Sequence, residues 1–246
     1  MTIKQLGFLM AASMAASLSF AQGSSELSLE LVTSYSQSTD SIQVDGKSAS
    51  FKTGGAGLKL RLDTANLGSF YTVAGGGYLP KQSASFAGVE LTGPSDSLFY
   101  GAGYSYDFHL SNRLAVSLVA DYVYYDISGD LDGEVFSQPV TADVDSTVTM
   151  LDSSIAVHYA VSRDLSAVVG LGVKRWNLEA TANGELSGFT VSTSVDANNT
   201  DPQFYIGAEF AISQVPVGIY YRRSQLSADN SVDLNGVDIR VLLMEF

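Results

Sequence analysis

The chain has 246 residues, with 13 Lys and Arg against 26 Asp and Glu, which gives a formal net charge of −13. A chain this acidic, without a basic stripe, excludes nucleic acid as a partner. Because the chain has no cysteine, a disulfide framework and a lipidated N-terminal cysteine are excluded as well. The 23 Gly and 13 Tyr suit tightly curved strands better than a helical enzyme.

The N-terminal residues have the pattern of a secretory signal. Lys4 supplies a positive start, an apolar stretch runs from Leu6 to Leu18, and Ser19 and Ala21 are small residues at the positions that a signal peptidase reads. We therefore predict a signal peptide over residues 1–21 and a single β-barrel domain over residues 22–246.

The rest of the chain predicts strands that are long for a soluble protein. Most of the strand-like runs have 10 to 14 residues, whereas a soluble strand usually has about 5–6 and a tilted membrane-spanning strand needs about 9–11. We predict ten strands, although closure with eight strands is an alternative. Their expected ranges are 26–37, 52–63, 68–80, 95–108, 114–126, 147–160, 165–178, 202–212, 217–226 and 236–246.

Side-chain alternation within these runs predicts a two-faced sheet. Between residues 165 and 174 the odd-numbered positions are all apolar, while the even-numbered ones include Ser166, Gly170, Gly172 and Lys174. Successive strand residues point to opposite faces, so the apolar face is expected to meet lipid and the polar face a lumen. Because no backbone group can remain unpaired in hydrocarbon, such a sheet must close on itself.

The connections alternate in length. Those after the second, fourth, sixth and eighth predicted strands are short, and those after the odd-numbered strands have 9 to 23 residues. Short turns are expected at the periplasm and long loops outside the cell. We predict an all-β, closed, antiparallel up-and-down transmembrane barrel with both termini in the periplasm.

This architecture resembles the small β-barrel proteins of the Gram-negative outer membrane. The resemblance covers the whole mature chain and extends to the C-terminal run, where Leu242, Met244 and Phe246 match the assembly signal that the barrel-assembly machinery reads. Asp238 and Arg240 break this apolar alternation, whereas Val237, Ile239 and Val241 continue it in the opposite phase. A β-bulge near Val241 and Leu242 would reconcile the two sets.

The net charge concentrates in the long connections, which hold 14 of the 26 acidic residues and only two basic ones. The acidic loops have two interpretations. They either act electrostatically, as a vestibule that attracts cations or as loops that divalent ions link to lipopolysaccharide, or they are simply a loop surface exposed to solvent. The candidate cation-attracting loop contains Asp130, Asp132, Glu134, Asp143 and Asp145. Its Asp-x-Asp-Gly-Glu segment places the glycine wrongly for an EF-hand, so we predict no specific metal site.

Eight charged residues are expected inside the barrel. Buried charges need partners, so these residues either pair across the lumen and fill it or form a selectivity ring in a pore. A barrel of ten strands lies close to the size at which side chains fill the interior. The predicted lumen charges are Glu30, Lys59, Arg61, Asp121, Asp152, Lys174, Glu209 and Arg222.

Two outer-membrane enzyme families offer alternatives, and neither matches well. Omptin proteases use aspartate pairs and a histidine at the extracellular lip, whereas His109 and His158, the two histidines, fall at the predicted periplasmic end. Lipid A deacylases carry a His-x-Ser pair on a lipid-facing strand. His109 and Ser111 have that spacing but occupy a predicted turn, and no carboxylate follows at a suitable distance to orient the histidine.

We therefore expect a non-enzymatic outer-membrane barrel without a cofactor, either a narrow porin-like channel with cation preference or a structural barrel. The alternatives are a surface-binding adhesion barrel that acts through acidic loops and, less favoured, a lipid A-modifying enzyme. The expected partners are outer-membrane lipid and lipopolysaccharide, the assembly machinery during biogenesis, and divalent cations.

Overall fold

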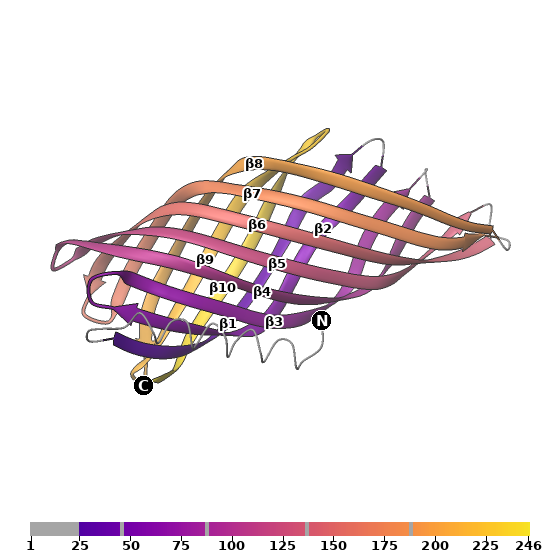
Figure 1. The fold of residues 1–246 in the computed structure, drawn as a ribbon. Helices are drawn as coiled ribbons and strands as arrows, with labels where there is room; N and C mark the ends of the chain where they lie inside the picture. Colours follow the sequence, from indigo (N-terminus) through magenta and orange to yellow (C-terminus); the bar gives the residue numbers. More distant parts are fainter. Residues whose placement is uncertain (1–24, 45–46, 87–88, 136–137, 187–188) are drawn as a thin grey trace.

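Ten antiparallel strands close into one barrel (Figure 1). The computed structural model describes residues 25–44, 47–86, 89–135, 138–186 and 189–246, so the predicted signal peptide lies outside the described residues. Each strand pairs with its neighbours in sequence, and β1 pairs with β10. The strands are β1 (Ser25–Val44), β2 (Lys47–Thr64), β3 (Gly68–Phe86), β4 (Val89–Ser111), β5 (Leu114–Val135), β6 (Gln138–Ser162), β7 (Leu165–Leu186), β8 (Phe189–Ile212), β9 (Val215–Ser227) and β10 (Ser231–Glu245).

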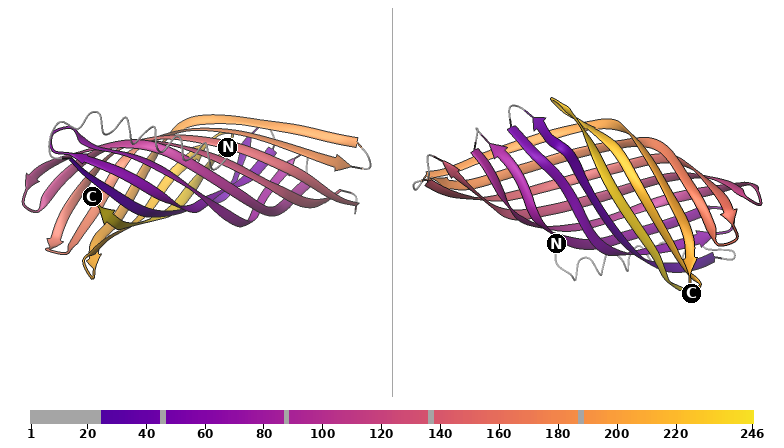
Figure 2. Two further views of the ribbon diagram at one scale, coloured as in Figure 1. Left: turned by 60° about the horizontal axis from the view of Figure 1, so that its bottom comes forward. Right: turned by 180° about the vertical axis from the view of Figure 1, so that it is seen from behind.

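Short turns gather at one end of the barrel, which we call the short-turn end. They follow β2, β4, β6 and β8, and the C terminus lies at the same end (Figures 1 and 2). In the turn between β8 and β9, Ser213 and Gln214 both have positive φ, at 49° and 73°. This combination belongs to the type I′ turn, whose twist matches that of the strands it joins. Among the described residues no helix is long and apolar enough to span a membrane.

At the opposite end, which we call the hairpin end, the strands extend beyond their predicted bounds. β6 has 25 residues, and its pairing with β5 continues from Leu114 and Tyr159 to Val135 and Gln138. Much of what the sequence predicted as long connections is therefore paired strand. The outward-facing residues of these segments are polar, which is why the sequence pattern predicts loops there.

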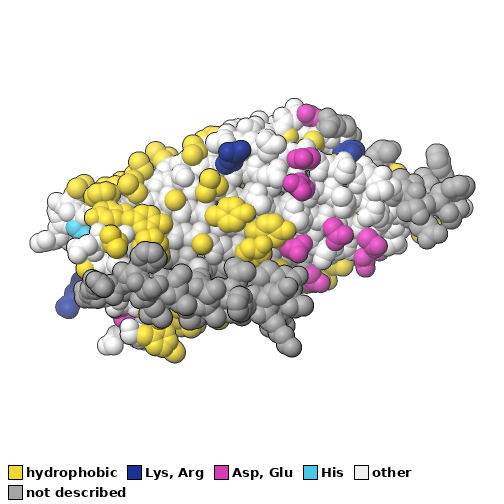
Figure 3. Space-filling view, in the orientation of Figure 1, with side chains coloured by type: hydrophobic (Ala, Val, Ile, Leu, Met, Phe, Trp, Pro, Cys, Tyr) yellow, Lys and Arg dark blue, Asp and Glu magenta, His cyan; other side chains and the backbone are white. Residues whose placement is uncertain are grey.

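Which face of each strand is apolar differs between the two ends of the barrel: the outer face is apolar near the short-turn end, and the inner face is apolar toward the hairpin end. In the part of β6 near the short-turn end, outward-facing Ile155 and Val157 are 54% and 41% exposed, and inward-facing Asp152 is buried. Toward the hairpin end the inward residues become apolar, as with Val148 and Met150, while the outward ones are Thr and Asp. Figure 3 shows the result: apolar side chains cover the surface toward the short-turn end and acidic ones the surface toward the hairpin end.

The last strand contains the bulge that the C-terminal pattern predicted, one residue further along. β1 residues Leu29 and Glu30 pair with Met244 and Leu242, so Leu243 is the extra residue. Before the bulge Asp238 and Arg240 line the interior, whereas Val237 and Ile239 are exposed on the outside. Phe246 is 67% exposed, and its backbone amide donates to the Leu27 carbonyl over 2.8 Å.

Because the outer face changes from apolar to polar along each strand, a charge should have different effects on stability at two outward-facing positions of β7. Val169 is 49% exposed in the middle of the apolar belt, and Asn177 is partly exposed on the same face beyond it. We expect Val169→Arg to cost about 2–4 kcal/mol of folding free energy in lipid vesicles, the penalty for a cation at the bilayer midplane. Asn177→Arg should cost far less in the same denaturant titration, and equal losses would contradict the assignment of the belt to lipid.

Candidate functional site: a polar chamber beneath an apolar plug

The interior of the barrel near the short-turn end is a polar chamber. Its main cavity has a volume of about 360 Å³, and it shares Arg61, Glu209, Tyr220 and Arg240 with a second cavity that opens at the mouth of the barrel. Glycines on the inner face make room for large side chains. A Cβ at Gly170 would lie 2.1 Å from the Tyr205 ring, and one at Gly103 would clash with Tyr71 and Asp121.

One group of charges lies where β1 to β3 line the chamber. The Lys59 Nζ is 3.2 Å from Glu30 Oε2, and the two side chains are 6% and 13% exposed. The same ammonium lies 4.2 Å from the centre of the Tyr71 ring, and the Tyr71 hydroxyl donates to Asp121 on β5. These contacts join four strands on one side of the lumen.

A second group crosses the bore. Arg222 on β9 lies 3.1 Å from Asp152 on β6 and 2.8 Å from Asp238 on β10. Lys174 on β7, which is the register partner of Asp152, lies 4.0 Å from it. Because β6 and β9 are not neighbours in the sheet, the pair formed by Asp152 and Arg222 spans the lumen and obstructs it.

A third group lies toward the mouth. The Tyr220 hydroxyl donates to Glu209 over 2.6 Å, and His158 Nδ1 is 3.4 Å from the other oxygen of that carboxylate. The Arg240 guanidinium lies 4.8 Å from the Tyr220 ring centre. Arg61 is 2.8 Å from Asp63 and donates to Ser69 over 2.9 Å. His109 lines the same chamber, so both histidines lie toward the short-turn end.

All eight lumen charges proposed from sequence line the interior, and the structure brings all of them into the three groups above. Sequence reasoning missed Asp238 and Arg240 because it treated them as interruptions of an apolar phase. The alternation along the strand could have identified them as inward-facing. Even-numbered positions hold Asp238, Arg240 and Leu242, and odd-numbered positions hold Val237, Ile239 and Val241. The tyrosines that bind the carboxylates carried no comparable signal.

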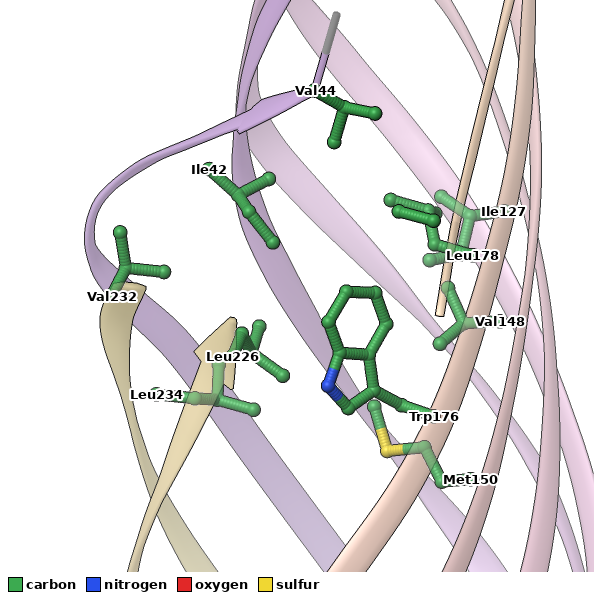
Figure 4. Packing of buried hydrophobic residues seen from close by; sticks show 11 residues of the cluster. Ile42, Val44, Ile127, Val148, Met150, Trp176, Leu178, Leu226, Val232 and Leu234 are labelled. Atoms are coloured by element: carbon green, nitrogen blue, oxygen red, sulfur yellow. The ribbon is translucent and has the colours of Figure 1, made fainter. Parts of the chain in front are cut away.

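Above the chamber, toward the hairpin end, a buried apolar cluster, which we call the apolar plug, lies inside the barrel (Figure 4). Trp176, which is 2% exposed, packs among side chains from β1, β5, β6, β7, β8, β9 and β10. Its Nε1–H donates to Asp201 over 2.7 Å, and the Ser227 amide donates to the same carboxylate over 3.0 Å. The sequence placed Asp201 on an outer connection, whereas it is buried inside the barrel. The plug comprises Ile42, Val44, Ile127, Val148, Met150, Trp176, Leu178, Ala197, Leu226, Val232 and Leu234.

The five acidic residues of the candidate cation-attracting loop lie on β5 and β6 rather than on a loop. Asp130 and Asp143 are register partners, and Thr141 donates to Asp132 over 2.7 Å. In the part of the chain that the structure describes, no three His, Asp or Glu side chains form a group that could hold a metal ion. The hydrogen bond from Asp143, together with its charge, raises the pKa of Asp130.

The acidic pair gives a prediction about titration. Asp143→Asn removes the facing charge, so we expect the pKa of Asp130 to fall toward the ordinary aspartate range in a carboxyl ¹³C NMR titration. A raised folded-state pKa adds stability that is complete below the ordinary pKa and is lost as the pH rises through the raised value. That pH-dependent contribution should therefore shrink in the variant. Asp145→Asn is the control, and an unchanged Asp130 midpoint in Asp143→Asn would contradict the pairing.

Asp152 gives a prediction about stability. Asp152 is 7% exposed and its carboxylate faces two cations. Asp152→Ala therefore removes this counter-charge from Lys174 and Arg222. Removal of one member of a buried ion pair costs about 3–5 kcal/mol, and we expect a loss of this size in the free energy of unfolding. Asp233→Ala breaks the pair with Arg223, whose side chain is 56% exposed, and should cost much less. Similar losses in the two variants would show that the chamber charges behave as solvated ones.

Comparison with known proteins shows the fold but no family. No protein-family model matches the chain, and no curated protein matches it in sequence. The translocator domain of the autotransporter NalP from Neisseria meningitidis has a TM-score of 0.55 at 11% identity, covering 97% of this chain and 96% of that one. The outer-membrane protease OmpT from Escherichia coli has a TM-score of 0.55 at 9% identity, covering 90% and 96%. The chain therefore has the closed transmembrane β-barrel fold of bacterial outer-membrane proteins.

Proposed function

We propose that this protein is a non-enzymatic integral protein of the Gram-negative outer membrane, a structural barrel whose bore is closed. Its short-turn end and both termini face the periplasm, and its hairpin end faces outward. Outer-membrane lipid and lipopolysaccharide surround the apolar belt, and the assembly machinery reads Leu242, Met244 and Phe246. The observation that carries the proposal is the apolar plug, which packs residues from seven strands across the bore.

Two features support closure over an open porin. Water and ions do not readily pass a stretch lined by packed apolar side chains, because nothing there replaces their hydrogen bonds. Beneath the plug, the pair of Asp152 and Arg222 crosses the lumen. A conducting porin would require both the apolar plug and this ion pair to move aside, whereas a structural barrel requires no such movement.

The histidine geometry supports a non-enzymatic protein. His109 lines the polar chamber rather than facing lipid, where a lipid-modifying site would need it. The Ser111 hydroxyl accepts a hydrogen bond from the Arg113 amide over 3.2 Å, which is a turn contact. His158 contacts Glu209 at the end of the barrel opposite the acidic surface, so the two histidines do not combine with the paired aspartates of the hairpin end.

Single-channel recording of the refolded protein in a planar bilayer tests the proposal. We expect no conductance steps from the wild-type protein. The double variant Met150→Ala and Trp176→Ala should open discrete steps, with cation preference because the acidic surface lies at the hairpin end. The control pair is Leu151→Ala and Arg175→Ala, the outward-facing neighbours of the same two positions, and it should remain silent.

Regular steps from the wild-type protein would reject a closed bore. A silent double variant that still shows the heat-dependent gel mobility of a folded barrel would instead assign the barrier to the ion-paired chamber. In that case Asp152 and Arg222 become the next positions to change.

A further inference from the structure

The backbone ladder between β2 and β3 is interrupted, and we call the unpaired interval the break. The two strands pair at Ala49 with Ala84 and again from Ala56 with Gly76, with a register shift between. Side chains bridge the interval: the Ser50 and Ser83 hydroxyls are 2.7 Å apart, and Gln82 Nε2 donates to the Lys52 carbonyl over 3.0 Å. Side-chain contacts of this kind separate more readily than a continuous backbone ladder.

The break begins at the outer edge of the apolar belt. Tyr35, which pairs with Gly54 at the lower end of the break, is 46% exposed, and Tyr78 on β3 is 64% exposed. Exposed tyrosines are typical of the membrane–water interface. A molecule dissolved in that interface would therefore meet the break directly.

Behind the break lies an apolar cavity of about 90 Å³. Its inner wall includes Ile127, Val148 and Leu178 of the plug, and its far side includes Leu131. Ser50 and Gln82, which bridge the break, form part of its rim. It shares no lining residue with the polar chamber, so its contents are separate from the ion-paired groups.

One polar group inside this cavity lacks a partner. Ser95 lines the cavity and is 5% exposed, yet its buried Oγ has no hydrogen-bond partner. By contrast, Ser97, two residues further along the same strand and 2% exposed, donates its hydroxyl proton to the Gly54 carbonyl over 3.0 Å. A buried hydroxyl without a partner is unfavourable, and a ligand with one hydrogen-bonding group would satisfy it.

We propose that the cavity is a binding site for a small, mainly apolar molecule that carries one hydroxyl group, with that hydroxyl bonded to Ser95 Oγ and entry through the break between β2 and β3. The volume fixes the size class. An apolar cavity of about 150 Å³ holds benzene, so a cavity of about 90 Å³ suits a molecule of three or four heavy atoms, the size of a short-chain alcohol.

Fluorescence of a tryptophan close to the cavity can report binding at this site. Trp176 is the single tryptophan of the sequence, and it packs with Val148 and Leu178, which also line the cavity. Bromine quenches indole fluorescence at short range. The probes are 2-bromoethanol and 1-bromopropane, which have four heavy atoms each and differ by a hydroxyl in place of a methyl group. With no cysteine in the chain, alkylation of thiols by these bromides does not arise.

In wild-type protein we expect saturable quenching by 2-bromoethanol. Ser95→Ala should weaken its binding about five-fold, as expected for loss of one hydrogen bond, and should leave 1-bromopropane binding undiminished. Ser97→Ala, the same change on the same strand outside the cavity, should alter neither probe. Ala180→Leu fills the cavity from β7 and should abolish the saturable component for both probes.

Quenching that rises linearly with both probes and is identical in all four proteins would overturn the site, because it would report collision alone. Equal effects of Ser95→Ala on both probes would overturn the assignment of Ser95 as the hydroxyl partner. Heat-dependent gel mobility checks the fold of every variant. If Ala180→Leu does not fold, the comparison of Ser95→Ala and Ser97→Ala still decides the outcome.

Discussion

Closure of the backbone ladder between β1 and β10 is the constraint on which the rest of the structure depends. Hydrocarbon offers no hydrogen-bond partner to a free strand edge, so the first and last strands must pair, and they do so from Ser28 with Glu245 to Ser38 with Leu234. Closure assigns every strand residue to the inside or the outside. The bulge at Leu243 preserves that assignment where the C-terminal sequence changes phase, and thereby places Asp238 and Arg240 in the lumen beside Arg222 and Tyr220.

The inside and outside are fixed along the whole length of a strand, but the solvent on the outside is not. Near the short-turn end the outer face meets lipid, and the lumen holds polar groups that pair with one another. Toward the hairpin end the outer face meets water, and the interior becomes an apolar core like that of a soluble barrel. On β7 the change falls between Lys174, which faces Asp152, and Trp176, which belongs to the plug. One strand thus carries both arrangements without a change of register.

This change explains what sequence reasoning could and could not predict. The number of strands, their order and the inward position of Lys59, Asp152 and Arg222 follow from alternation and from the spacing of short turns. The hairpin extensions were missed because a polar outer face was equated with a loop, although Val144, Val148 and Met150 already alternate with Asp145, Thr147 and Thr149. Contacts across the bore, such as Asp152 with Arg222, depend on barrel diameter and tilt, which no local pattern encodes.

The polar chamber and the apolar zone around the plug also differ in what can occupy a gap between their side chains. In the chamber a gap can hold water, since charged and hydroxyl groups line it and buried water needs two to four polar partners. In the apolar zone a gap of similar kind cannot be hydrated in the same way, because the plug offers few such groups. The cavity at Ser95 lies in this second zone. Its rim residues Ser50, Lys52 and Gln82 already form hydrogen bonds within the wall, and among the described residues the buried Ser95 hydroxyl lacks a partner. An apolar molecule with a single hydroxyl therefore matches this cavity better than water does, and the break in the wall beside it provides the route of entry.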